Sequence, residues 1–266
     1  MKSSKSKIFN LEKFYLDCID AKGNCFIFYW ASLEIYYLKF YYSGLIFSDS
    51  KNVTIENYSL KKTPQPLVNK LMSIDYPLLQ IKGSWLQRDK PILFSLYKDK
   101  KNCELIWNCH HPKALTEIEY NNITFKGYGY AETLSLPVKP WNIPIKELKW
   151  GRFLSDHYTI IWIHWKGENP LNRIICNGKE YNDATFLVDR VIFNQGCFVL
   201  LFQDISTLRT GRISNILTES YLLKTIVCSR ILNGNETKWK AKTVLALNDK
   251  IVEDGWSLYE KVTWKK

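Results

Sequence analysis

Apolar and polar residues alternate at short intervals along most of the chain, and the alternating runs are rich in β-branched and aromatic residues. Such runs are typical of half-buried β-strands, whereas long helical periodicities are scarce. Many short antiparallel strands favour closed barrels over an open sheet, because closure removes unpaired edges. The dipeptide Asn177-Gly178 between two of the runs is a strong hairpin signal. We expect strands near 78–85, 92–98, 104–109, 124–134, 154–165, 173–176, 179–183, 185–193, 197–204, 222–232, 239–247 and 255–264.

The chain has 266 residues, which permits one large β domain or two small ones. Residues 104–112 resemble residues 159–170 in their order of apolar residues, tryptophan and proline. This similarity fits two related barrels in tandem or a chance likeness between two tryptophan-bearing strands. We expect a seam within 111–122, which would divide the chain into an N-terminal β domain, 1–118, and a C-terminal β-barrel domain, 119–266.

The formal net charge of +11 raises the possibility of nucleic-acid binding. However, only seven of the 37 basic residues are arginine, and many of the lysines occupy alternate positions in strand runs. In the run "KWKAKTVLAL", for example, Lys238, Lys240 and Lys242 share one face, which predicts a solvated lysine face on a half-buried strand. The charge therefore does not indicate a nucleic-acid partner.

Seven cysteines, an odd number without a C-x-x-C pair, fit reduced thiols in a cytosolic protein better than a disulfide framework. Residues 1–17 lack the apolar core of a signal peptide. The most apolar run, 26–47, contains Glu34 and Lys39, which makes it a poor membrane span. We therefore expect a cytoplasmic protein with no stable membrane span, whose oligomeric state the sequence leaves open.

One carboxylate, Glu132, lies on an otherwise apolar strand face. In "GYGYAETL" strand alternation places Tyr128, Tyr130, Glu132 and Leu134 on one face, and small residues on the other. A small face lets another backbone or side chain approach closely. Burying a carboxylate is costly unless it is paired or neutralised, so Glu132 requires an explanation.

Glu260 raises the same question, because "WSLYEKVTW" places it on a face with Trp256 and Leu258. Two explanations are open for these carboxylates. Arg152, in the sequence Trp150-Gly151-Arg152, could neutralise Glu132 or Glu260 in a buried ion pair. Alternatively, an apolar pocket raises the pKa of a carboxyl, which then holds a proton at neutral pH and donates it to a substrate.

The histidines give no metal signal. Cys109, His110 and His111 are adjacent, and neighbouring strand residues point to opposite faces. His164 shares a face with Trp162, which indicates a core or pocket histidine. Because no nucleotide-binding glycine loop precedes a helix either, the sequence predicts neither a metal nor a cofactor.

Several segments, taken in order, resemble the lipocalin-like superfamily of hydroxyneurosporene synthase (carotenoid 1,2-hydratase). Tocopherol cyclase and the lipocalin-like Diels–Alderases are similar more loosely. The resemblance covers most of residues 10–266 and is densest over 104–167. It implies two lipocalin-like antiparallel β-barrel domains in tandem, with an apolar ligand pocket. The segments are "WNCHHPKA", "GYGYAE", "PWNIPIKELKWGR", "IIWIHW" and "DGWSLYEKVTW".

The carotenoid hydratases carry a G-x-G-Y-H-D-H-N stretch whose acidic residue is implicated in protonating an olefin. Gly127, Gly129 and Tyr130 match this stretch, and Glu132 falls at its acid. Ala131 stands where the first histidine would be, and the His-Asn that follows the acid is replaced as well. The resemblance therefore implies acid-assisted chemistry, or binding, rather than carotenoid hydration.

Two functions are consistent with these features. The first is an enzyme that cyclises, hydrates or isomerises a hydrophobic small molecule of isoprenoid or polyketide type, with Glu132 as its catalytic acid. The second is a non-catalytic lipid or pigment binding protein of lipocalin type. In either case the residues expected to contact the ligand are Tyr128, Tyr130, Trp150, Arg152, Trp162, His164 and Glu260.

Overall fold

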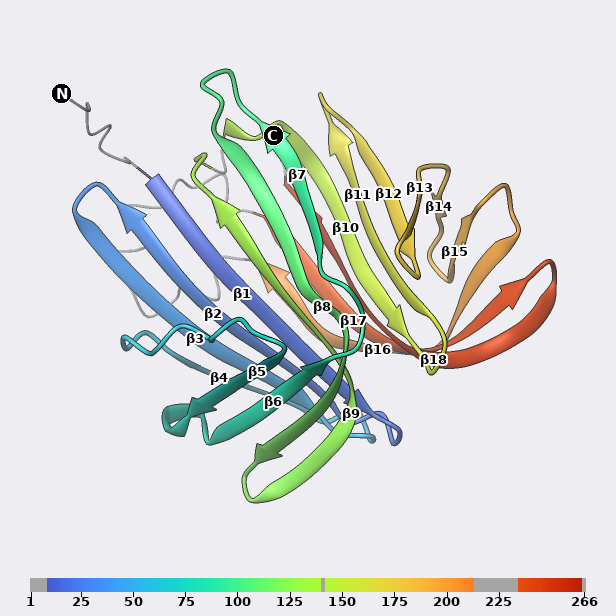
Figure 1. Cartoon of the computed structure of the whole chain (residues 1–266), viewed down its shortest axis with the longest axis horizontal. Helices are drawn as coiled ribbons and strands as arrows, with labels where there is room; N and C mark the ends of the chain where they lie inside the picture. Colours follow the sequence, from blue (N-terminus) through green and yellow to red (C-terminus); the bar gives the residue numbers. More distant parts are fainter. Residues whose placement is uncertain (1–8, 140–141, 213–233, 265–266) are drawn as a thin grey trace. The chain divides into compact units, whose positions relative to one another are not determined.

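The computed structural model describes residues 9–139, 142–212 and 234–264. These residues form antiparallel strands with one short 3-10 helix, as the alternating pattern predicts (Figure 1). They divide into two compact units, 1–143 and 144–266, each built on one curled antiparallel sheet. The strand expected over 222–232 lies outside the described residues.

The division between the units differs from the one drawn on the sequence. A boundary at 118/119 falls inside strand β8 (Glu104–Tyr120), which pairs along its length with β9 (Ile123–Leu136). Because β9 also pairs with β1 (Phe9–Asp20), the hairpin belongs wholly to the first sheet. The boundary between the units therefore falls after this hairpin in the sequence, between Ile143 and Pro144.

The first sheet has the strand order β4-β3-β2-β1-β9-β8-β6-β5, with β7 also paired to β8. A single 3-10 turn, η1 (Pro77–Leu79), connects β5 and β6. The remaining bounds are β2 (Cys25–Ile35), β3 (Leu38–Ser48), β4 (Thr54–Ser59), β5 (Leu71–Tyr76), β6 (Ile81–Gln87) and β7 (Ile92–Lys98).

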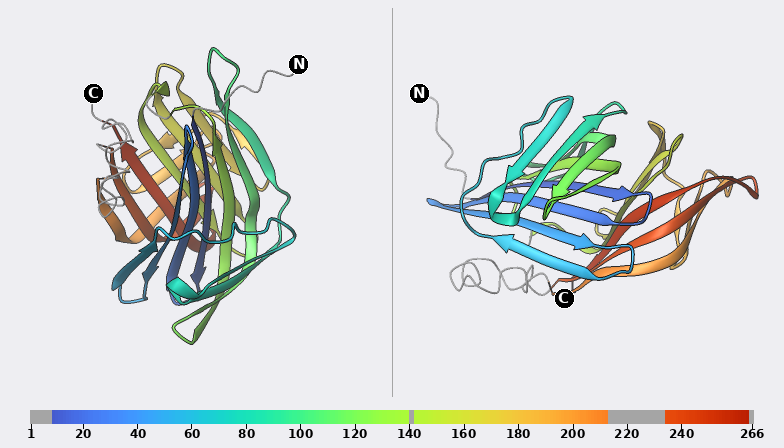
Figure 2. Two further views of the ribbon diagram at one scale, coloured as in Figure 1. Left: turned by 90° about the vertical axis from the view of Figure 1, so that its left-hand side faces the viewer. Right: turned by 90° about the horizontal axis from the view of Figure 1, so that it is seen from below.

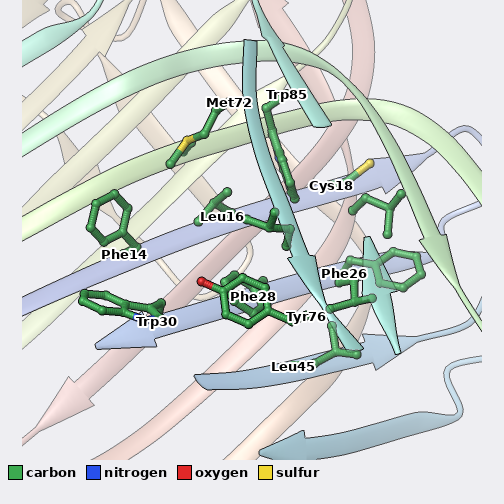
Figure 3. Packing of buried hydrophobic residues seen from close by; sticks show 14 of the residues in the cluster. Phe14, Leu16, Cys18, Phe26, Phe28, Trp30, Leu45, Met72, Tyr76 and Trp85 are labelled. Atoms are coloured by element: carbon green, nitrogen blue, oxygen red, sulfur yellow. The ribbon is translucent and has the colours of Figure 1, made fainter. Parts of the chain in front are cut away.

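One face of the first sheet carries a buried aromatic and aliphatic cluster (Figure 3). Alternate residues of β1, including Phe14 and Leu16, point into it. Leu45 on β3 and Met72 on β5 lie near opposite ends of the strand order yet belong to the same cluster. The sheet therefore curls toward this side, which we term its core face, and the opposite side is its outer face.

The second sheet has the order β13-β12-β11-β10-β18-β17-β16-β15-β14, and its curl can be followed in Figure 2. Ile174 and Val191, near opposite ends of this order, share one buried cluster, which defines the core face of this sheet. The bounds are β10 (Ile145–Leu154), β11 (Thr159–Gly167), β12 (Leu171–Cys176), β13 (Lys179–Tyr181), β14 (Thr185–Phe186), β15 (Arg190–Phe193), β16 (Phe198–Arg212), β17 (Asn235–Leu247) and β18 (Lys250–Thr263). In its β12–β13 hairpin Asn177 and Gly178 have φ of 47° and 81°, which confirms the turn predicted there.

Both sheets bury side chains on their outer faces as well. Tyr15 and Tyr130 are buried on the outer face of the first sheet. Arg152, Ile161 and Leu258 are buried on the outer face of the second. Strand alternation therefore tells which residues share a face, but in this chain it does not tell which face meets water.

This double burial overturns the expectation of a solvated lysine face on β17. Lys242 is exposed, but Lys238 and Lys240 are buried. The Lys238 ammonium lies 3.0 Å from Glu236 and also pairs with Glu260. Two of the three lysines therefore occupy a buried face, and for Lys238 the acidic partners offset the cost of burying its charge.

Candidate functional site

Glu132 lies in the middle of β9, on the outer face of the first sheet. Its direct cross-strand neighbours are Tyr15 on β1 and Cys109 on β8. The preceding residue, Ala131, points to the core face and belongs to the buried cluster there. The candidate acid is therefore held by the two central strand pairings of the sheet, on the side away from the barrel core.

Two neutral donors hold one oxygen of the Glu132 carboxyl. The Tyr130 hydroxyl and the Trp107 indole N–H both donate to Oε2. Within the part of the chain that the structure describes, the other oxygen, Oε1, has no hydrogen-bond partner, yet it keeps some accessible surface. Oε2 therefore serves as the anchored acceptor of this carboxyl group.

Aromatic rings surround this carboxyl on its own sheet. Tyr15 packs edge-on against Tyr130 at 6.0 Å and against Tyr29 at 5.4 Å between ring centroids. The Lys13 ammonium lies 5.1 Å from the centre of the Tyr29 ring. The environment of Glu132 thus combines aromatic walls with one nearby cation, as its tyrosine-rich strand face suggested.

Burial raises the pKa of Glu132 above its ordinary value. The hydrogen bonds from Tyr130 and Trp107 and the charge of Lys13 oppose the shift, and the carboxylate of Asp17 adds to it. Although the residue retains some accessible surface, its carboxyl group is densely surrounded by protein atoms, and this crowding outweighs the opposing groups. The proton therefore stays on Glu132 to a higher pH than on an exposed glutamate.

The small face of the "GYGYAE" strand has the structural role expected of it. Gly129 lies on the core face beside the buried Trp85, whose indole N–H donates to the Asp17 carbonyl at 2.8 Å. A side chain at Gly129 would overlap that carbonyl and the indole. The glycine thus allows Trp85 to bond across β9 to β1, which fixes the strand that carries Glu132.

Other predicted site residues lie on the outer face of the second sheet. Trp150 is the cross-strand neighbour of Glu260 on β18. Glu260 forms an ion pair with Lys238 of β17, a partner that the sequence pattern did not indicate. Arg152 is fully buried and donates to the Trp256 carbonyl at 2.9 Å. Its side chain thus supports β18 at that point.

Known proteins resemble this chain in structure but not in sequence. The sequence matches no protein-family model and no curated protein sequence. Among solved structures, CghA with Sch210972 is similar with a TM-score of 0.59 at 10% identity, over 97% of this chain and 89% of that one. Kievitone hydratase from Nectria haematococca gives 0.57 at 8%, over 96% and 89%. An AttH candidate from Nitrosomonas europaea gives 0.53 at 7%, over 96% and 92%.

The chain has the tandem lipocalin-like fold. Two curled antiparallel sheets with these structural neighbours confirm, at the level of fold, the resemblance read from the sequence. In neither sheet of the described residues do the two end strands pair with each other, so each is a half-barrel rather than a barrel closed by hydrogen bonds.

The lipocalin-like fold places the predicted site residues on three different sheet faces. Tyr128 and Tyr130 share the outer face of the first sheet with Glu132. Trp150, Arg152 and Glu260 occupy the outer face of the second sheet. Trp162 and His164 lie on the core face of that second sheet.

Gly151, between Trp150 and Arg152, is the residue that lets two neighbouring side chains pack closely against β10. It lies on β10 between Trp162 and Tyr259, and a methyl group there would overlap both side chains. Gly151→Ala should therefore destabilise the protein by about 1–3 kcal/mol, the usual cost of overpacking a core. Denaturant unfolding measures this directly, and an unchanged midpoint would show that Trp162 can move aside.

The residues that sequence reasoning missed lie on β8. Trp107 and Cys109 share the outer face with Glu132, and Trp107 is one of its two hydrogen-bond donors. Alternation along "ELIWNC" indicates that these two residues share a face. The β8–β9 register, which brings that face next to Glu132, is interrupted by a bulge near His111 and is not visible in the sequence.

Across 9–139, 142–212 and 234–264, no group of three or more His, Cys, Asp or Glu side chains is arranged to hold a metal ion. In the same ranges, no helix has the length and hydropathy needed to cross a bilayer. A surface hollow of about 430 Å³, lined by residues such as Asp75, Lys82 and Glu119, does not include Glu132.

Proposed function

We propose that this protein is an enzyme that acts on a hydrophobic small molecule, with Glu132 as the proton donor. The observation that carries the proposal is the asymmetric binding of its carboxyl group. Tyr130 and Trp107 hold Oε2, burial raises the pKa of the carboxyl group, and Oε1 is the oxygen from which we infer the proton is donated.

The chemistry suited to this arrangement is protonation of a carbon–carbon double bond. A proton moves from Oε1 to one olefinic carbon, and a carbocation forms at the other. The rings of Tyr15 and Tyr130 stabilise that cation through their π faces, and the donors on Oε2 stabilise the new carboxylate. Loss of a neighbouring proton to the Glu132 carboxylate then gives an isomer. Attack of a second double bond of the substrate on the cation, followed by the same proton loss, gives a cyclised olefin. Addition of water, followed by loss of a proton from the added water, gives a hydrated product.

Structural neighbours support the general class of this proposal. One of them is a hydratase by name, and another holds the small molecule Sch210972. The present chain shares their fold at about one-tenth sequence identity, so the reaction and the substrate are inferred from Glu132 and its surroundings. Of the residues expected to contact the substrate, Tyr128 and Tyr130 share the face of Glu132.

A second candidate is a non-catalytic lipid or pigment binding protein. The same atom, Oε1 of Glu132, supports it. A neutral carboxyl with Oε2 anchored is also a good hydrogen-bond donor through Oε1. It would hold a ligand carbonyl or hydroxyl without transferring the proton. Catalysis and binding then differ in what happens to the bound molecule.

The test is the identity of the small molecules that co-purify with the protein. Wild type, Glu132→Gln and the control Glu119→Gln, an exposed residue of β8, are extracted with solvent and analysed by mass spectrometry. An enzyme accumulates an unreacted precursor on Glu132→Gln alone. The same molecule in equal amounts from all three proteins would contradict catalysis and support the binding protein.

A further inference from the structure

A row of three polar side chains crosses the core face of the second sheet. His164 on β11 lies directly opposite Lys149 on β10 and Asn172 on β12. His164 points to the same side as Trp162, two residues away, which belongs to the buried cluster. Directly opposed side chains on adjacent strands lie close enough to contact one ligand group.

The two outer members of this row hold a segment of backbone across it. The Asn172 side-chain amide donates to the Ala184 carbonyl at 2.8 Å, and the Lys149 ammonium donates to the Phe186 carbonyl at 3.2 Å. The Phe186 ring lies 4.8 Å from the His164 ring, centroid to centroid. Residues 184–186 thus form a wall beside the histidine.

Two polar atoms in this row are buried and have no protein partner. They are Nδ1 of His164 and Oδ1 of Asn172. Burial, and then the charges of Lys149 and Lys166, lower the pKa of His164, so its ring is neutral near pH 7. Buried polar atoms normally have a hydrogen-bond partner, and an orphaned pair this close together indicates a partner from outside the protein.

Aromatic rings lie beside the polar row, on the same core face. Trp162 stacks with Phe202 at 6.0 Å, and Phe202 stacks with Tyr259 at 4.6 Å. Trp239 stacks on the same tyrosine at 5.2 Å. Trp162 and Phe202 are buried, whereas Tyr259 and Trp239 keep exposed surface. The aromatic floor is therefore partly open to a flat apolar molecule.

We propose that the polar row and the aromatic floor form a second binding site, made by the second unit alone, for a planar aromatic molecule that carries a hydroxyl group. The aromatic body packs on Tyr259 and Trp239. Its hydroxyl donates to Asn172 Oδ1, an acceptor that a carboxylate ligand would leave unsatisfied. The His164 ring and the Lys149 ammonium are placed to donate to the same hydroxyl oxygen.

The test compares three probes of one shape by isothermal titration calorimetry. We expect 2-naphthol to bind more tightly than naphthalene or 2-naphthoate. His164→Phe and Asn172→Leu should weaken 2-naphthol by about tenfold, the usual effect of one hydrogen bond, and leave naphthalene unchanged. Melting curves show whether His164→Phe and Asn172→Leu fold. If one of them does not, the affinities of the other variant decide the test.

Lys242→Ala is the matched control, because this exposed residue lies on the outer face of the second sheet and its loss should leave 2-naphthol binding unchanged. Three results would overturn the proposal. They are the absence of saturable 2-naphthol binding, equal affinity for 2-naphthol and naphthalene, and a loss of 2-naphthol binding in Lys242→Ala that matches the loss in Asn172→Leu. None of these results bears on proton donation by Glu132.

Discussion

Glu132→Gln should lower turnover at least about a hundredfold, the usual contribution of a general acid, and should leave the fold intact. The amide carbonyl of glutamine can accept from Tyr130 and Trp107 as Oε2 does, so both hydrogen bonds survive. The amide has no proton of comparable acidity to give. Product formation under single-turnover conditions, with the substrate recovered from the variant, measures the loss.

The raised pKa of Glu132 gives the stability of the wild-type protein a pH dependence of known sign, which Glu132→Gln lacks. Below the ordinary glutamate pKa, about 4.3, the carboxyl is protonated in both the folded and the unfolded chain. As the pH rises, the unfolded chain releases this proton first, because the folded pKa is raised, and the folded state loses relative stability until the folded pKa is passed. Glutamine lacks this loss, so the melting temperature of Glu132→Gln should equal or exceed that of wild type, increasingly so above pH 4.3.

A Glu132→Gln variant that melts well below wild type at neutral pH would contradict this, because it would show that the native carboxylate is ionised and paired. Unchanged turnover with an intact fold would remove Glu132 from the chemistry. The exposed Glu119→Gln serves as the control for both measurements.

Lys238→Ala should lower the free energy of unfolding by about 3–5 kcal/mol, the usual cost of breaking a buried ion pair from one side. Lys238 is almost fully buried between Glu236 and Glu260. Arg209 continues to neutralise Glu236, but the partner that the structure shows for Glu260 is lost. Chemical denaturation at neutral pH measures the effect.

Two further variants make this test specific. Lys242→Ala, at an exposed position of the same strand and the same outer face, should change the free energy of unfolding little. Lys238→Met combined with Glu260→Leu should recover much of the lost stability, because no unpaired charge then remains at that position. Equal and small effects of Lys238→Ala and Lys242→Ala would show that the network is solvated.

The strand content and the surroundings of Glu132 were predictable because both depend on alternation within one strand. Tyr130 and Glu132 are two residues apart, and their shared face follows from the period of a strand. Trp107 and Tyr15 come from other strands, and pairing between strands depends on register and bulges that single-strand alternation does not reveal. Of the two hydrogen bonds to Glu132, the one from Trp107 could therefore not be predicted from the sequence.

The lysines of β17 illustrate the other limit. Alternation correctly groups Lys238, Lys240 and Lys242, but the assumption that charged residues mark the solvated face is wrong for the first two. Both faces of this sheet bury side chains, so a charged residue no longer marks the face that meets water. The domain boundary was displaced for a related reason, since the seam expected at 111–122 is the polar part of a continuous hairpin.

The pKa of Glu132 itself is the most direct test of a neutral acid held by Tyr130 and Trp107. In protein labelled with ¹³C at the glutamate carboxyl, the resonance that disappears in Glu132→Gln identifies the group. That resonance should titrate clearly above the ordinary glutamate value of about 4.3. A midpoint at or below this value would show an ionised carboxylate at neutral pH, and Glu132 would then not be the proton donor.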